Sequence, residues 1–301
     1  MNSPAGASVK LALAATLASV VLGGCAAAAP EVRAGEPTAA AGQPIVLGQA
    51  YTLPAPSLGD QRTVNVALPF GYADHPERRY PVLYLIDGGV DQDFVHIVGT
   101  EQLGAMWGRN AQPIIVGIAS KDRRRELIGP TGDAKLRAQY PTAGDSAKFR
   151  TFLRDELKPF VAAHFRTDGT SGVIGESLAG LFIVETWLRE PSLFDNYAAI
   201  SPSMWWDDGA LSREAAMLVG DGQAGTRLYL AAEDEGAEYQ AHVDRFVAAL
   251  GKAHGWCYAQ PQATHATIYH AVSPAAIQFL FPPAEAPDPQ FGFEVQCSQK
   301  S

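Results

Sequence analysis

Short apolar runs alternate with longer amphipathic segments along most of the chain. The runs are apolar at successive positions, which is typical of parallel strands buried on both faces. The amphipathic segments repeat their apolar residues at three- and four-residue spacing, as helices do. The pattern predicts strands over residues 62–68, 81–86, 113–118, 171–174, 197–200, 227–231 and 256–260, and helices over residues 93–107, 146–165, 178–189, 238–254 and 271–280.

This alternation predicts an α/β fold with a mainly parallel central sheet and helices on both of its faces. Polar and apolar residues alternate over 62–68, which indicates an antiparallel hairpin at the edge of the sheet. Pro159 lies inside the predicted helix 146–165, so we expect a kink there.

The two ends of the chain differ from its centre. Residues 1–24 carry a single charge, Lys10, and an apolar stretch too short to span a membrane, so they are predicted to be a signal peptide. Residues 25–44 are rich in Ala, Pro and Gly and predict a flexible tether. One folded domain is expected over 45–281, followed by a Pro-rich tail over 282–301 whose apolar residues favour packing back onto it.

The signal peptide ends in Leu22-Gly23-Gly24-Cys25, which resembles the bacterial lipobox, whose cysteine receives a lipid. An ordinary secretory cleavage within residues 26–29 is the alternative. Because Ala26 rather than an aspartate follows the cysteine, the resemblance points to the outer membrane or the periplasmic face of the cell envelope.

Composition narrows the range of partners. The 301 residues are 47% hydrophobic and 18% charged, which describes a folded chain. With 23 Lys and Arg against 32 Asp and Glu, the net charge of −9 argues against nucleic-acid binding. An acidic chain does not bind anionic lipid by charge, so we expect membrane attachment only through the lipid on Cys25.

The strand over 171–174 leads directly into Gly175-Glu-Ser177-Leu-Ala-Gly180 and then into an apolar helix. A serine nucleophile on such a tight turn needs small residues two positions before and two after it. Gly175 and Ala179 meet that requirement, so Ser177 is the candidate nucleophile.

A serine nucleophile needs a histidine base and usually a carboxylate that orients the histidine, and on this fold both follow the serine. Of the seven histidines, His265 and His270 lie beyond the last predicted strand, and His265 is favoured because it lies in a loop. Three carboxylates follow strand 227–231, namely Glu233, Asp234 and Glu235. Spacing from Ala232 favours Glu235 and then Asp234, and a Ser-His dyad without an acid remains open.

Two further groups of residues are candidates for the same site. The oxyanion needs two backbone N–H groups, which we assign to Leu178 and to Gly89, with Gly88 as the alternative. Four side chains are candidates for substrate binding: Arg123 and Arg125 from a basic cluster after strand 113–118, and the adjacent Trp205 and Trp206. A surface turn for the arginines and loop packing for the tryptophans are the alternatives.

These residues together resemble the esterase branch of the α/β-hydrolase superfamily, which holds siderophore trilactone esterases, feruloyl esterases, S-formylglutathione hydrolases and mycolyltransferases. The resemblance covers about residues 46–281 and rests also on Tyr80-Pro-Val-Leu-Tyr-Leu-Ile-Asp-Gly88, Asp122-Arg-Arg-Arg-Glu-Leu127 and Ile200-Ser-Pro-Ser-Met-Trp-Trp206. Siderophore esterases are the most similar subgroup, which implies a Ser-His pair with a variable third member. The chain departs from the pattern of this family at two positions. Gly129 is an extra residue between Leu127 and Pro130, and Glu233 stands where the family usually has a glycine.

The sequence therefore predicts a serine hydrolase that cleaves a small-molecule ester through an acyl-enzyme, without cofactor or metal. Acyl transfer on the same fold and a non-catalytic envelope lipoprotein that binds a ligand are the alternatives. The three cysteines are too scattered for a zinc site. After export, Cys257 and Cys297 would either form a disulfide that fixes the tail or remain as two thiols.

The lipobox generates a test of localisation. Cys25→Ser removes the sulfur that accepts the lipid, so the protein is expected to move from the membrane fraction to the soluble envelope fraction. Fractionation followed by immunoblotting measures this. Unchanged membrane association of the variant would contradict the lipobox.

Overall fold

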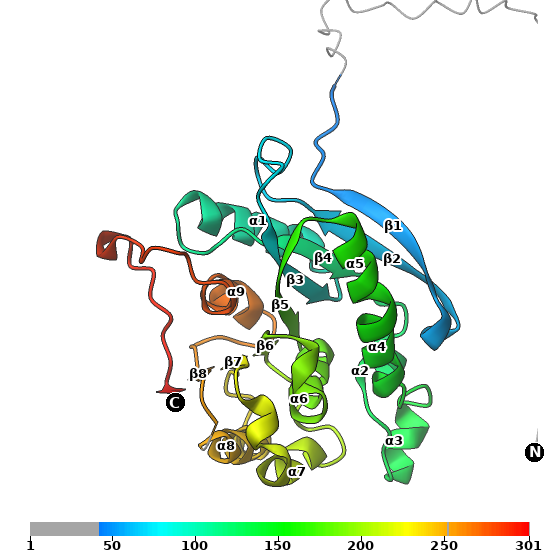
Figure 1. The fold of residues 1–301 in the computed structure, drawn as a ribbon. Helices are drawn as coiled ribbons and strands as arrows, with labels where there is room; N and C mark the ends of the chain where they lie inside the picture. The colour runs from blue at the N-terminus through cyan, green and yellow to red at the C-terminus, as the bar shows by residue number, and fades with distance from the viewer. Residues whose placement is uncertain (1–41, 252, 301) are drawn as a thin grey trace, which may run out of the picture. The chain divides into compact units, whose positions relative to one another are not determined.

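The computed structural model describes residues 42–251 and 253–300 (Figure 1). The chain divides into the units Met1–Ile45 and Val46–Ser301, and the fold below is that of the second unit. The predicted signal peptide, Cys25 and most of the predicted tether lie outside the described residues. Within the described residues, no helix has the length and apolar character needed to cross a membrane.

A single twisted sheet forms the centre of the fold (Figure 1). Its strands lie in the order β1-β2-β4-β3-β5-β6-β7-β8-β9. Pairing is parallel from β4 to β8, whereas β1, β2 and β9 pair antiparallel at the two edges. The strands are β1 Gln49–Ala55, β2 Asp60–Ala67, β3 Tyr80–Ile86, β4 Ile114–Ile118, β5 Thr167–Glu176, β6 Asn196–Ile200, β7 Arg227–Ala231, β8 Trp256–Ala259 and β9 Gln299–Lys300.

Helices cover both faces of this sheet. The α-helices are α1 Phe94–Met106, α2 Arg123–Leu127, α3 Ala134–Gln139, α4 Ser146–Phe152, α5 Lys158–His164, α6 Leu178–Arg189, α7 Ala210–Leu218, α8 Ala237–Leu250 and α9 Ile268–Leu280. Shorter turns are η1 Pro56–Leu58, η2 Leu153–Leu157, η3 Pro191–Leu193, η4 Asp221–Gln223 and η5 Pro289–Phe291.

The alternation of side chains along the strands produces two hydrophobic cores. In β3, Val82 and Tyr84 face one core, and Leu83 and Leu85 face the other. The first core contains apolar residues of α4, α5, α6, α7 and α8, and the second contains those of α1 and α9. The predicted α/β fold, with a mainly parallel sheet covered on both faces, is confirmed.

The long predicted helix 146–165 is interrupted. It consists of α4, the π-helical turn η2 and α5, and Pro159 lies in the first turn of α5. A proline has no N–H to donate and its ring clashes with the preceding turn, so the hydrogen-bond register changes just before it. Helix α7 and the short helices α2 and α3 were not among the predicted elements.

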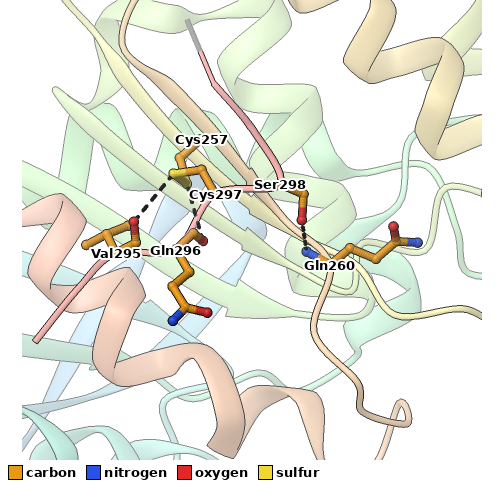
Figure 2. The surroundings of a disulfide bond; sticks show 6 residues. All are labelled: Cys257, Gln260, Val295, Gln296, Cys297 and Ser298. Carbon is orange, nitrogen blue, oxygen red and sulfur yellow. Dashed lines mark hydrogen bonds between the residues drawn. A yellow bond between two sulfur atoms is a disulfide. The ribbon is translucent and has the colours of Figure 1, made fainter. Parts of the chain in front are cut away.

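The C-terminal tail returns to the far edge of the sheet. Strand β9 pairs with β8, and Ser298 donates its N–H to the carbonyl of Tyr258 at 2.7 Å. A disulfide joins Cys257 of β8 to Cys297 (Figure 2). Next to it, Gln260 donates its N–H to Ser298 Oγ at 3.1 Å. The tail is therefore part of the folded unit.

The disulfide should stabilise the fold. It closes a loop of 40 residues, for which the chain-entropy model gives about 4 kcal/mol. We expect reductant to lower the free energy of unfolding of the parent protein in urea titrations by up to that amount. Cys297→Ser should resemble the reduced parent and show no response to reductant.

The same experiment has a direct chemical control. Peptide mapping of denatured, unreduced protein after alkylation should leave Cys257 and Cys297 unmodified, and alkylation of both would contradict the disulfide.

Candidate active site

The site lies at the carboxyl ends of the central parallel strands. The backbone hydrogen bonds of the sheet continue one step beyond three strands: from Ser177 N to the Ile200 carbonyl (3.0 Å), from Ser201 N to the Ala231 carbonyl (2.7 Å) and from Ala232 N to the Ala259 carbonyl (3.1 Å). The residues that follow β5, β6 and β7 therefore begin side by side at one edge of the sheet. This is the edge at which open α/β sheets bind ligands.

Ser177 occupies the sharp turn between β5 and α6. Its φ of +61° lies in a region that side chains other than glycine rarely adopt. A Cβ on Gly175 would lie 2.6 Å from the Cβ of Ala179, and one on Gly180 would lie 2.7 Å from the Ile200 carbonyl oxygen. The turn therefore needs these glycines, and alanine at position 179 is tolerated only because Gly175 faces it.

His265 lies in the turn immediately before α9. This turn is closed by the N–H groups of Thr267 and Ile268, which both donate to the Thr264 carbonyl at 2.9 Å. The Nε2 atom of His265 lies 3.2 Å from Ser177 Oγ. The structure therefore brings together the predicted nucleophile and the predicted base at a distance that allows proton transfer.

Two carboxylates approach the other nitrogen of His265. Nδ1 lies 3.1 Å from Glu233 Oε1 and 3.0 Å from Glu235 Oε1. The side chain of Glu233 is 1% exposed and that of Glu235 is 31% exposed. Asp234 instead accepts a hydrogen bond from the N–H of Gly236. The geometry favours Glu233 as the orienting acid over the predicted Glu235, because an acid held away from water interacts more strongly with the imidazole.

The pKa shifts of the three side chains also favour Glu233 over Glu235 as the orienting acid. The hydrogen bond to Glu233 raises the pKa of His265. Burial alone would raise the pKa of Glu233, but hydrogen bonds from His265 and Ser201 outweigh it and lower that pKa. Burial, together with the charge of Glu233, raises the pKa of Glu235. Of the two glutamates, Glu233 therefore holds its negative charge more firmly beside the imidazole.

Ser201 is a further member of the site. It follows β6, is 1% exposed and has a φ of +42°. Its Oγ donates to Glu233 Oε1 at 2.8 Å and lies 2.8 Å from His265 Nδ1. Ser201 therefore bridges the acid and the base. Ser201 belongs to the sequence motif 200–206, but the residue pattern of that motif did not indicate that Ser201 contacts Glu233 and His265.

The structure supports one of the predicted oxyanion donors. Leu178 lines the pocket and begins α6, where first-turn N–H groups have no acceptor within the helix. The N–H of Gly89 instead donates to Gln92 Oε1 at 2.9 Å, and the N–H of Gly88 donates to the Ile118 carbonyl at 2.8 Å. Packing requires glycine at position 88, because an added Cβ would lie 2.3 Å from the Cα of Gly117. Neither glycine offers an unengaged donor in this structure.

The pocket above Ser177 has a volume of about 710 Å³ and a basic wall. Lys121, Arg123 and Arg124 line it. Arg123 is held by Asp87, whose Oδ2 accepts from Nε at 2.8 Å. Arg125, also predicted to bind substrate, does not line this pocket: its Nε donates to Asp145 at 2.8 Å and a terminal nitrogen donates to the Leu58 carbonyl at 2.9 Å. Consecutive residues of the short helix α2 project in different directions, so only part of the basic cluster reaches the pocket.

The two tryptophans also separate. Trp205 lines the pocket and is 37% exposed. Trp206, also predicted to bind substrate, is 5% exposed, belongs to the core and does not line this pocket. Tyr140 contacts both, with its ring centroid 6.1 Å from that of Trp205 and 5.5 Å from that of Trp206. Tyr140 and Trp205 therefore give the pocket an aromatic side.

Within the described residues, one cluster presents three ligand atoms close enough to hold a metal ion. It consists of Glu233, Glu235 and His265, whose ligand atoms all lie within 4.8 Å of one another. A cation there would compete for His265 Nδ1, the atom that contacts Glu233. The arrangement fits acid-base chemistry without a metal, because Nε2 of the same ring faces Ser177.

The fold and the site define an α/β hydrolase: a mainly parallel sheet, a serine at the turn from strand to helix, and a histidine before the last helix. Residues 55–250 match the family model described as "Putative esterase". The chain belongs to this family.

Known proteins with similar sequences are siderophore esterases. The chain is 30% identical over 183 residues to the ferri-bacillibactin esterase BesA of Bacillus subtilis, covering 52% of this chain and 62% of that protein. It is 28% identical to the siderophore triacetylfusarinine C esterase of Aspergillus fumigatus, covering 54% and 58%. The matches thus span about three-fifths of these relatives. An IroE-like serine hydrolase from Shewanella oneidensis superposes with a TM-score of 0.68 at 27% identity, covering 78% of this chain and 80% of that one.

The two glutamates can be separated by their effect on pH dependence. Catalysis by His265 needs the neutral ring, so kcat/KM should rise as the pH increases through its pKa. Glu233→Gln removes the interaction that raises this pKa, so the acidic limb should move to lower pH. The plateau should fall by about 10²- to 10⁴-fold as the ring loses its orientation.

Glu235→Gln is the matched control. Because this side chain is partly exposed, we expect a smaller shift and a loss below about tenfold. A larger loss in Glu235→Gln than in Glu233→Gln, measured over the same pH range, would reverse the assignment.

Proposed function

We propose that the protein is a serine carboxylic ester hydrolase that works through an acyl-enzyme at Ser177. The observation that carries the proposal is the 3.2 Å contact between Ser177 Oγ and His265 Nε2, with Glu233 at His265 Nδ1. A serine hydroxyl becomes a nucleophile when a neighbouring base accepts its proton, and a carboxylate that orients the base completes this arrangement.

In the proposed reaction, Ser177 Oγ attacks the ester carbonyl carbon while its proton passes to His265 Nε2. The N–H of Leu178 donates to the developing oxyanion. The intermediate collapses when the alkoxide leaves and takes the proton from Nε2, which gives the acyl-enzyme and the free alcohol. Water then gives a proton to Nε2 as its oxygen attacks the acyl carbon. The bond from the acyl carbon to Ser177 Oγ breaks as Oγ takes that proton back from Nε2, which releases the carboxylic acid and restores Ser177. Throughout, Glu233 stabilises the imidazolium.

The pocket wall supports esters that carry acidic aryl groups as substrates. Arg124 has no ion-pair partner in the described part of the chain, and its guanidinium carbon lies 5.0 Å from the centre of the Tyr140 ring. In the same part of the chain, Arg123 pairs with Asp87 through Nε, and its terminal nitrogens make no ion pair or hydrogen bond. Cations beside aromatic rings bind planar anionic or catecholate groups well. Two similar proteins are siderophore esterases, which supports a siderophore ester as the substrate.

We also propose that the enzyme acts in the cell envelope, attached through a lipid on Cys25 at the outer membrane or its periplasmic face. The lipobox-like sequence at residues 22–25 supports the attachment. The disulfide between Cys257 and Cys297 supports export, because disulfides persist in oxidising compartments.

The nucleophile can be tested with a fluorophosphonate probe and with p-nitrophenyl butyrate. The parent protein should be labelled at Ser177 and should hydrolyse the ester. Ser177→Ala should lose labelling and at least about a thousandfold of the activity. A variant as active as the parent would end the proposal.

Ser203→Ala is the control for the labelling, because Ser203 carries a second hydroxyl in the pocket, 3.4 Å from Ser177 Oγ. It should keep the label on the peptide that contains Ser177. Product analysis with an added acceptor alcohol separates hydrolysis from acyl transfer, since a transferase would yield the new ester.

A further inference from the structure

A second pocket, of about 420 Å³, lies between the end of α1, helix α9 and the returning tail. It shares no lining residue with the pocket above Ser177. Leu103 and Trp107 line it from the α1 side, Pro274 from α9, and Phe291 and Phe293 from the tail. Its size lies within the usual range for small-molecule sites.

Arg109 supplies the charge of this pocket. It is half-buried, and no ion pair joins it to a carboxylate among residues 42–251 and 253–300. Its Nε donates to Gln278 Oε1 at 3.0 Å, which leaves the two terminal nitrogens without a protein partner in the same part of the chain. Burial lowers the pKa of Arg109, although an arginine side chain stays protonated. Because Arg109 is partly removed from water and has no ion-pair partner among these residues, a ligand anion could bind to its terminal nitrogens.

The walls beside Arg109 are apolar and open to solvent. Leu103 is 58% exposed, Trp107 is 51% exposed and Phe291 is 41% exposed. The guanidinium carbon of Arg109 lies 5.1 Å from the centre of the Phe293 ring. The hydroxyl of Thr100, another lining residue, already donates to the His96 carbonyl. Exposed apolar side chains gathered around one cation match a ligand with an apolar body and one negative charge.

The tail wall of the pocket is held in place. Gln278 Nε2 donates to the Phe293 carbonyl at 2.9 Å, so one side chain positions both Arg109 and the tail. Trp107 and Phe291 meet with ring centroids 5.5 Å apart. Further along, the disulfide at Cys297 fixes the tail to β8 (Figure 2). A ligand would therefore meet a largely preformed site, which lowers the entropic cost of binding.

We propose that this pocket binds a medium-chain fatty acid, with its carboxylate on the terminal nitrogens of Arg109 and its hydrocarbon chain between Leu103, Trp107 and the tail phenylalanines. A flexible hydrocarbon chain suits walls that are built from separate apolar side chains and offer its body few hydrogen-bond partners. A catechol or sugar would leave its hydroxyl groups unpaired there. This site is independent of catalysis at Ser177.

Isothermal titration of the folded full chain with laurate, below its micellar concentration, tests the proposal. Dodecyltrimethylammonium has the same chain length and the opposite charge, and butyrate has the same carboxylate without the long chain. Both should bind at least about tenfold more weakly than laurate, because each lacks one of the two matched features. Equal binding of dodecyltrimethylammonium and laurate would contradict the role of Arg109.

Variants locate the site. Arg109→Gln should weaken laurate binding at least about tenfold, whereas Arg123→Gln, which changes the other pocket, should leave it unchanged. Leu103→Glu places a carboxylate at an exposed position beside the pocket, so it should repel laurate without disturbing the fold. It keeps the test valid if Arg109→Gln lowers stability. Thermal melts verify the fold of each variant.

Three outcomes would overturn the proposal. Loss of binding only in Arg123→Gln would place laurate in the pocket of Ser177. Full binding by both Arg109→Gln and Leu103→Glu would show that the second pocket is not used. Binding to anionic phospholipid vesicles without binding of monomeric laurate would make this surface a membrane contact. Ser177→Ala should bind laurate as the parent does, so a failure of the esterase proposal is visible separately.

Discussion

The contact between His265 and the buried carboxylate of Glu233 is the interaction on which the rest of the site depends. Glu233 follows β7, Ser177 follows β5, and His265 lies in the turn before α9. Parallel pairing of β5, β6 and β7 brings the ends of these strands to one edge, and the hydrogen bonds beyond each strand fix their relative positions. The sheet register therefore determines whether Nε2 reaches Ser177 while Nδ1 faces an acid.

The same register explains why Ser201 belongs to the site. It follows β6, the strand between those that carry the nucleophile and the acid, and its Oγ contacts both Glu233 and His265. Ser177, Ser201 and Asp87 all have positive φ values at the ends of neighbouring strands. Backbone strain of this kind concentrates at functional sites, where the surrounding structure holds it in place.

The sequence predicted those features that depend on local pattern. Apolar runs located the central strands, because strands buried on both faces have no polar alternation to obscure them. The turn around Ser177 was recognisable because a tight turn of this kind requires small residues. In the structure, a side chain at Gly175 would collide with Ala179, and one at Gly180 would collide with the Ile200 carbonyl. His265 followed from its place in the loop before the last helix.

The orientation of adjacent residues was not predictable in the same way. Glu233 and Glu235 both reach His265, yet their burial differs, and burial depends on elements distant in the sequence. Arg123 enters the pocket while Arg125 pairs with Asp145, and Trp205 enters it while Trp206 joins the core. In each pair the residue type indicated a candidate site residue, but packing against distant elements determined which of the two side chains faces the site.

Charge placement adds a consequence for substrate recognition. The chain has a net charge of −9, yet the wall above Ser177 carries Lys121, Arg123 and Arg124. A local cationic surface on an acidic molecule concentrates positive potential at the pocket and attracts anionic ligands to it. Asp87 neutralises part of this charge and holds Arg123 in one orientation, so Arg124, which is stacked on Tyr140, is the less constrained cation. The proposed recognition of an acidic aryl ester would then combine one guanidinium held in a fixed orientation with one that can adjust its position.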